Sequence, residues 1–127
     1  MPQELWQQLK SEAQQVIQQE PLLASYVSAC VLNHNSLQSA LSFILANKLS
    51  DDVMPAATVR ELFDKAFSES PDIVENAACD IKAVFERDAA VSTHLAVILY
   101  MKGFQSIQVH RLAHFLCVNN RTELALF

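Results

Sequence analysis

The chain has 127 residues, of which 51% are hydrophobic and 18% are charged, and its formal net charge at pH 7 is −5. This length and apolar content suit one globular core. The acidic balance, without a cluster of lysine or arginine, argues against nucleic acid as a partner. The only glycine is Gly103. Because glycine supplies the positive-φ positions of tight hairpins and phosphate-binding loops, its scarcity predicts a helical protein.

Three features of the sequence point to a cytoplasmic protein. The N-terminus lacks the basic flank and apolar core of a signal peptide, and the longest apolar run, Leu95 to Met101, is too short to span a bilayer. The cysteines, Cys30, Cys79 and Cys117, are odd in number and widely spaced, which favours reduced thiols. Without a CxxC pair they do not suggest a zinc site, and each is expected to be a small buried hydrophobic residue.

The first half of the chain is predicted to form four helices. Apolar residues recur at helical spacing over residues 5–17, 22–31, 37–49 and 59–67. Pro21 suits the first turn of the second helix, and Ser36 is a plausible N-cap of the third. Residues 50–52 form a polar loop, and Pro55 opens the fourth helix.

In the second half, Ser70, Pro71 and Asp72 form a start signal with an N-cap, a proline at the first helical position and an acid in the first turn. The fifth helix then covers residues 73–85. An apolar helix over 91–101 is expected to be separated from the next, over 104–116, by a kink near Gly103. Thr122 is expected to cap a last short helix.

The residues therefore predict an all-α fold, a single compact domain of about seven to eight helices over residues 1–127. Its apolar end, Leu124 to Phe127, is too short for an independent helix. This ending suggests that more protein follows, and a tail packed back on the domain is the alternative.

Two histidines and three acids are the candidates for chemistry. His110 and His114 could share a helix face, but no third ligand is evident, so surface or interface histidines are the favoured interpretation and no metal is expected. Asp80, Glu86 and Asp88 lie near the end of the fifth helix. Paired carboxylates can do acid–base work, although a solvated helix end is the simpler interpretation.

No nucleophile motif surrounds the serines within the helical patterns. From the chemistry of its residues alone, the chain is predicted to be a helical interaction or oligomerisation module.

Several stretches together are more specific. They are Glu20–Ser25, Ser39–Ser42, Leu45–Leu49, Met54–Ala56, Ala77–Val84, Arg87–Ala90, Leu99–Gln108 and Arg111–His114. In this order and at these distances they resemble the N-terminal helical domain of bacterial serine O-acetyltransferase, and the resemblance covers essentially the whole chain.

The resemblance implies a role in the first step of cysteine biosynthesis, the transfer of acetyl from acetyl-CoA to serine. In that family a left-handed β-helix of hexapeptide repeats follows the helical domain, binds CoA and carries the catalytic histidine. The helical domains join two trimers into a hexamer, and a C-terminal tail docks into O-acetylserine sulfhydrylase. Residues 1–127 contain no hexapeptide repeats, so the resemblance implies neither catalytic residues nor bound CoA for this piece, and it implies no membrane partner.

One site residue follows from the resemblance. Asp88 matches the aspartate of the family's Arg-Asp-Pro-Ala stretch, which helps hold the amino group of serine or of inhibitory cysteine. The sequence departs from the family at Ala89 and Val97, where prolines are usual, and at Cys117 and Asn120, where tryptophan and glycine are typical. Two hypotheses stay open: a piece of an active acetyltransferase, or a naturally short non-catalytic assembly or regulatory protein.

Overall fold

A computed structural model describes residues 2–127, and these residues are mostly helical, without a strand. The predicted all-α fold is confirmed. The α-helices are α1 (Pro2–Gln19), α2 (Ala24–Val27), α3 (Leu37–Leu49), α4 (Ala56–Glu69), α5 (Asp72–Arg87), α6 (His94–Tyr100), α7 (Lys102–Val118) and α8 (Thr122–Leu126). A 3₁₀ turn, η1 (Pro21–Leu23), and a π-helical segment, η2 (Ser28–Leu32), flank α2.

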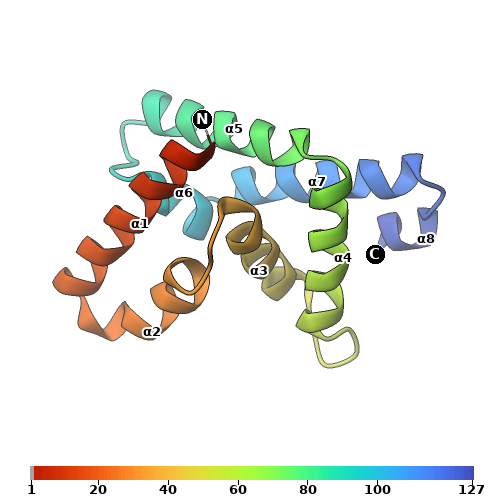
Figure 1. The fold of residues 1–127 in the computed structure, drawn as a ribbon, viewed down its shortest axis with the longest axis horizontal. Coiled ribbons are helices and arrows are strands. Elements are labelled where there is room, and N and C mark those ends of the chain that lie inside the picture. Colours follow the sequence, from red (N-terminus) through yellow and green to blue (C-terminus); the bar gives the residue numbers. More distant parts are fainter. Residues whose placement is uncertain (1) are drawn as a thin grey trace.

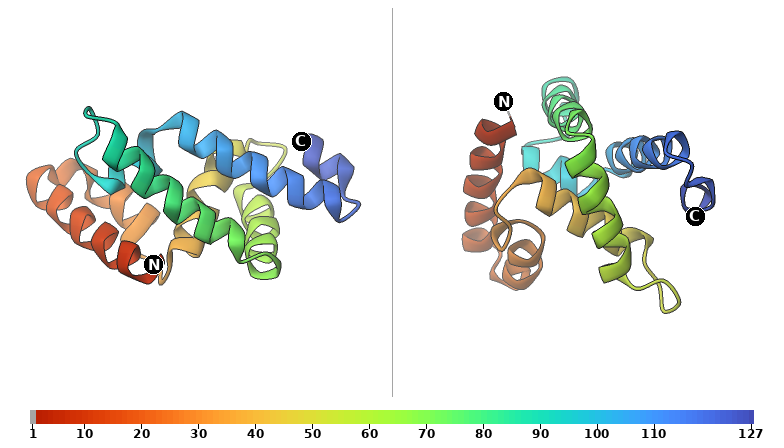
Figure 2. Two further views of the ribbon diagram at one scale, coloured as in Figure 1. Left: turned by 90° about the horizontal axis from the view of Figure 1, so that it is seen from above. Right: turned by 45° about the vertical axis from the view of Figure 1, so that its right-hand side comes forward.

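The helices surround a core to which α1, α3, α5 and α6 each contribute. In Figure 1, α1 and α2 form one side of the molecule, α4 and α8 form the other, and α5 runs across the top between them. The short helix α6 lies beneath α5, and α7 runs away from it toward α8, as Figure 2 shows from above. Leu9, Leu41, Ile81 and Ile98, one from each core helix, are essentially inaccessible to solvent. In the part of the chain that the structure describes, none of the helices combines the length and hydrophobicity that a membrane crossing requires.

The second predicted helix is divided into three kinds of helical turn. Its π-helical end is closed by a bond from the Asn33 N–H to the Ser28 carbonyl at 2.8 Å. The Ala29 carbonyl accepts from Nε2 of His34 at 2.8 Å, so a side chain takes a carbonyl that a regular α-helix would pair with backbone.

The corner between α6 and α7 lies at Met101, where the predicted helix over residues 91–101 ends, and two residues before Gly103, near which the kink is expected. Met101 is extended (φ −87°, ψ 101°), while Gly103 lies inside α7 with a negative φ. The buried Gln105 side chain donates to the carbonyls of Ile98 at 3.0 Å and Leu99 at 3.2 Å. It thereby stabilises the corner by pairing carbonyls at the end of α6.

Helix starts agree with the sequence in part. Ser36 caps α3 as predicted, because its Oγ accepts from the Ser39 N–H at 3.2 Å. Pro71 is itself the N-cap of α5, one residue later than expected, because the chain already turns there through a bond from Ile73 N–H to the Ser70 carbonyl.

Two other helix starts differ from the prediction. The helix expected from Val91 begins at His94, where Thr93 Oγ1 accepts from the Ala96 N–H at 3.1 Å. Thr122 is the first residue of α8 rather than its cap, and no side chain caps that helix.

The cysteines do not share one environment. Cys30 is buried as predicted, but Cys79 and Cys117 are exposed. Both lie within helices, α5 and α7, and the sides of these helices that carry them face solvent.

Candidate functional site

Asp88 is the C-cap of α5 and forms hydrogen bonds to the loop that follows. Its N–H donates to the Val84 carbonyl at 2.9 Å, and its own carbonyl accepts from the Val91 N–H at 3.1 Å. The carboxylate Oδ1 accepts from the Ala90 N–H at 2.9 Å, the local turn that aspartate often makes with its own backbone. The bond from Ala90 fixes the carboxylate within the loop. Because Asp88 is only half-buried, the carboxylate is still open to a ligand.

Asp88 lines an open groove of about 640 Å³ between the end of α5 and the start of α7, which we call the Asp88 groove. Asp80 and Arg87 line it from α5, and Gly103 and Ile107 line it from α7. A Cβ built on Gly103 would meet nothing within 4 Å. The α7 side of the groove is therefore open surface at this point.

Asp80 is held by two side chains of α7. Its Oδ2 accepts from Gln108 Nε2 at 2.9 Å and from Arg111 Nη1 in an ion pair. Arg111 Nη1 also donates to Gln108 Oε1 at 2.8 Å. Because Gln108 is fully buried, this cluster fixes α5 against α7 along the wall of the groove.

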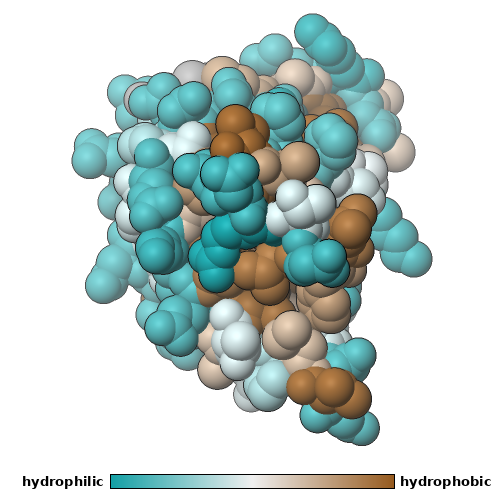
Figure 3. All heavy atoms as spheres, turned by 90° about the vertical axis from the view of Figure 1, so that its right-hand side faces the viewer, coloured by the Kyte–Doolittle hydropathy of each residue, from teal (hydrophilic) through white to brown (hydrophobic). Residues whose placement is uncertain are grey.

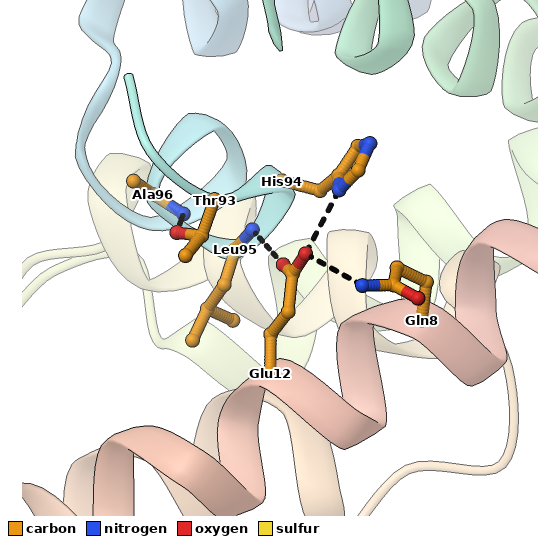
Figure 4. A network of polar contacts seen from close by, with 6 residues as sticks. All are labelled: Gln8, Glu12, Thr93, His94, Leu95 and Ala96. Carbon is orange, nitrogen blue, oxygen red and sulfur yellow. Dashed lines mark hydrogen bonds and ion pairs between the residues drawn. The ribbon is translucent and has the colours of Figure 1, made fainter. Parts of the chain in front are cut away.

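The far end of the Asp88 loop is joined to α1. Figure 4 shows the Glu12 carboxylate of α1 directed at the first residues of α6. Its Oε1 accepts from the Leu95 N–H at 2.9 Å, and its Oε2 accepts from His94 Nδ1 at 2.9 Å and from Gln8 Nε2 at 3.1 Å. The His94 ring, besides its bond to Glu12, stacks on the ring of Phe85 of α5, with ring centroids 3.9 Å apart.

The remaining candidates lie outside this groove. His110, His114 and Glu86 are exposed. Residues 2–127 contain no group of three side chains placed to hold a metal ion. Of the three acids singled out from the sequence, Asp80 and Asp88 share the groove and Glu86 does not line it.

Sequence reasoning missed Glu12 and Gln108, although both carry a signal. Glu12 falls at helical spacing within the apolar stripe of Leu5, Leu9 and Ala13, and Gln108 lies four residues from Phe104 and from Leu112. A polar residue on an apolar stripe is buried and must find a hydrogen-bond partner. The sequence alone does not say which partner, since the carboxylate meets residues more than eighty positions away.

A second hollow of about 390 Å³ lies between α4, α7 and α8 and is mainly apolar. Figure 3 shows the hydrophobic side chains that gather on this face of the molecule. Leu62, Val109, Leu116, Leu124 and Phe127 are among those that line it. Its composition suits apolar side chains rather than a polar substrate.

Comparison with known proteins defines the class to which this helical domain belongs. Residues 5–109 match the family model described as serine acetyltransferase, N-terminal. The chain therefore belongs to the serine acetyltransferase family and corresponds to its N-terminal domain.

Individual relatives agree with this assignment. The serine acetyltransferase of Haemophilus influenzae is 44% identical over 124 residues, which are 98% of this chain and 46% of that protein. A serine acetyltransferase solved in complex with cysteine is 44% identical and superposes with a TM-score of 0.96 over 99% of this chain and 52% of the other. One solved in complex with CoA gives 44% identity and a TM-score of 0.97 over 99% of this chain and 54% of the other. The chain thus spans about half the length of the relatives it matches.

Proposed function

We propose that residues 1–127 are the N-terminal assembly domain of a serine O-acetyltransferase, which transfers acetyl from acetyl-CoA to L-serine, and that Asp88 supplies one wall of the amino-acid site. The observation that carries this proposal is the Asp88 carboxylate, fixed at the end of α5 and open to the Asp88 groove. The relatives solved with cysteine and with CoA support it, because they share this fold at 44% identity. The general base and the CoA site belong to the domain that follows in the family.

Asp88 alone is half of a site. A carboxylate facing an ammonium is a favourable charge-assisted contact. At a solvent-exposed position, however, such a pair contributes roughly 1 kcal/mol or less, which does not offset the entropy lost when a small ligand is captured. The second wall, which we assign to the β-helix of the longer enzyme, has to supply the rest of the binding free energy.

The first experiment uses the 127-residue chain itself. We expect no acetylation of serine in an assay with acetyl-CoA, because catalysis needs both substrates held together. We also expect no submillimolar binding of serine or cysteine in calorimetric titration. Turnover that scales with purified protein, or submillimolar binding, would show that the site is complete without a second domain.

The second experiment replaces Asp88 with Asn in the complete enzyme. Serine use and cysteine inhibition should weaken together, by roughly tenfold or more if about 1.4 kcal/mol is lost, because both ligands present the same ammonium. Glu86→Gln is the matched control, since Glu86 is exposed and does not line the groove. Unchanged serine kinetics and cysteine inhibition in Asp88→Asn would show that Asp88 is only a solvated helix end.

Self-association through the helical domain is the second part of the proposal. Leu22 of η1 and Tyr26 of α2 are 95% and 40% exposed, and Tyr100 at the end of α6 is 56% exposed. Burial, and after it Cys30 and Tyr100, raise the pKa of Tyr26 above its ordinary value, so the phenol is neutral at pH 7 and adds uncharged surface to this side. Apolar surface of this kind on a small domain favours an interface, in keeping with hexamer formation, as a dimer of trimers, through this domain in the family.

A further inference from the structure

The buried Glu12 carboxylate has no part in the proposed amino-acid site. Glu12 is 7% exposed, and a carboxylate at such a position is costly unless hydrogen-bond donors compensate it. Its donors are Gln8 on its own helix and two groups at the start of α6, the His94 ring and the Leu95 N–H (Figure 4). The carboxylate therefore fixes the position of His94 relative to α1.

His94 in turn closes the loop that begins at Asp88. Its ring lies nearly parallel to that of Phe85, with an interplanar angle of 18° and a centroid separation of 3.9 Å. Phe85 belongs to the last turn of α5, the turn that precedes Asp88 in the chain. The Phe85–His94 stack thus joins the two ends of the loop to each other, and the bonds of Glu12 join the His94 end to α1.

Inside the closed loop, backbone groups hold Asp88. The Ala90 N–H donates to Asp88 Oδ1 at 2.9 Å, and the Val91 N–H donates to the Asp88 carbonyl at 3.1 Å. The direction of the carboxylate therefore depends on where residues 90 and 91 lie. Their place depends on where the loop is anchored at His94.

We propose that Glu12, His94 and Phe85 are positioning residues for Asp88. They hold residues 89–93 in the conformation in which the Ala90 N–H directs the Asp88 carboxylate to the Asp88 groove. None of the three side chains lines that groove, so their effect on a ligand is transmitted through the loop. The functional consequence of this inference rests on the proposed role of Asp88 in binding the amino group.

The first test uses the 127-residue chain and needs no ligand. In His94→Ala, we expect amide exchange at Ala90 to rise about tenfold more than in a control of comparable stability, and the Asp88 χ1 rotamers to become averaged in scalar couplings. Ser36→Ala is the control, because it removes the N-cap of α3 and lies outside the loop, and Ala90 exchange in each variant is compared after the measured loss of global stability is subtracted. Equal exchange at Ala90 in the two variants, with an unchanged Asp88 rotamer, would overturn the inference.

Two milder variants keep the test decisive if His94→Ala does not fold. His94→Phe retains a ring to stack on Phe85 and loses the bond to Glu12, whereas Glu12→Gln retains an acceptor for the Leu95 N–H. In both variants the exchange rate of the Ala90 amide should lie between the rates of the parent and of His94→Ala. If His94→Ala is unfolded, both rates should still exceed that of the parent. Exchange equal to the parent in both variants would contradict the proposal.

The second test measures kinetics in the complete acetyltransferase. His94→Phe should raise the KM for serine about threefold to tenfold and leave the KM for acetyl-CoA unchanged, because only the amino-acid wall is disturbed. Equal changes in both KM values, or none in either, would overturn the positioning role. If Asp88→Asn has no effect on serine use, the proposed function fails, while Ala90 exchange and the Asp88 rotamer still decide whether the network positions Asp88.

Discussion

His34 is a buried histidine whose two ring nitrogens are both paired. Nε2 lies 2.8 Å from the Ala29 carbonyl, which can only accept, so Nε2 carries the proton. Nδ1 then accepts from the Ser39 hydroxyl at 2.7 Å. Burial lowers the pKa of His34 below its ordinary value of 6.5, the Ala29 bond and Asp64 oppose the shift, and Arg60 adds to it.

This geometry predicts a pH dependence of stability. Because the pKa of His34 is lower in the folded than in the unfolded state, its contribution is fully present above the unfolded value of 6.5 and is lost as the pH falls toward the folded value. Between about pH 7.5 and pH 5.5, the melting temperature of the parent should fall more than that of His34→Gln. His110→Gln, at an exposed position, controls for the loss of a histidine. Parallel pH profiles for the parent and His34→Gln would contradict this prediction.

At the scale of the element, the end of α7 shows where the backbone is strained. Asn120 is the only residue between 2 and 127 with a positive φ, 64°. The Arg121 N–H donates to the Leu116 carbonyl at 2.8 Å, and the Asn120 N–H donates to the Cys117 carbonyl at 3.2 Å. These two bonds form a Schellman motif, in which glycine is the favoured residue at the left-handed position and asparagine is the next best.

Asn120→Gly should therefore stabilise the domain by about 0.5 to 1 kcal/mol, because glycine has no Cβ to oppose a positive φ. The free energy of unfolding from urea denaturation is the measurement. Asn119→Gly is the matched control and should not stabilise, since Asn119 has a φ of −98° and its side chain donates to the Phe115 carbonyl at 2.8 Å. A free energy of unfolding for Asn120→Gly at or below that of the parent would show that the asparagine side chain compensates the strain.

At the scale of the whole molecule, the exposed apolar residues of the α1–α2 side predict self-association. Light scattering on a sizing column should show a dimer or larger species, and Leu22→Glu should shift it toward monomer because a charge would be buried at the interface. Val53→Glu is the control, since Val53 is 91% exposed in the segment between α3 and α4, and Figure 1 shows that segment beside α4, on the side of the molecule away from α1. A parent that stays monomeric at tens of micromolar, an order of magnitude suited to weak interfaces, would contradict the prediction.

Much of this fold could be predicted from local patterns. The apolar spacing located the helices, and Ser36 and Pro55 marked helix starts correctly, because such signals act within one or two turns of the chain. The break after the predicted helix over 91–101 is expected near Gly103, but its place at Met101 and its cause could not be read in this way. The one glycine nearby, Gly103, is helical, and the corner is instead held by Gln105 bonds to the end of α6.

The sequence by itself determined the helical class, the family and the candidate Asp88. The spacing of apolar residues and the order of the matched stretches can both be read along the chain, without knowing which distant residues are in contact. Only the tertiary structure decided that Glu12 meets His94 and Leu95, that Asp80 is held by Gln108 and Arg111, and that Asp80 and Asp88 share one groove. An apolar stripe predicts which face of a helix is buried. It does not specify the polar partner of a buried carboxylate, because that partner is supplied by whichever distant helix packs against the same face.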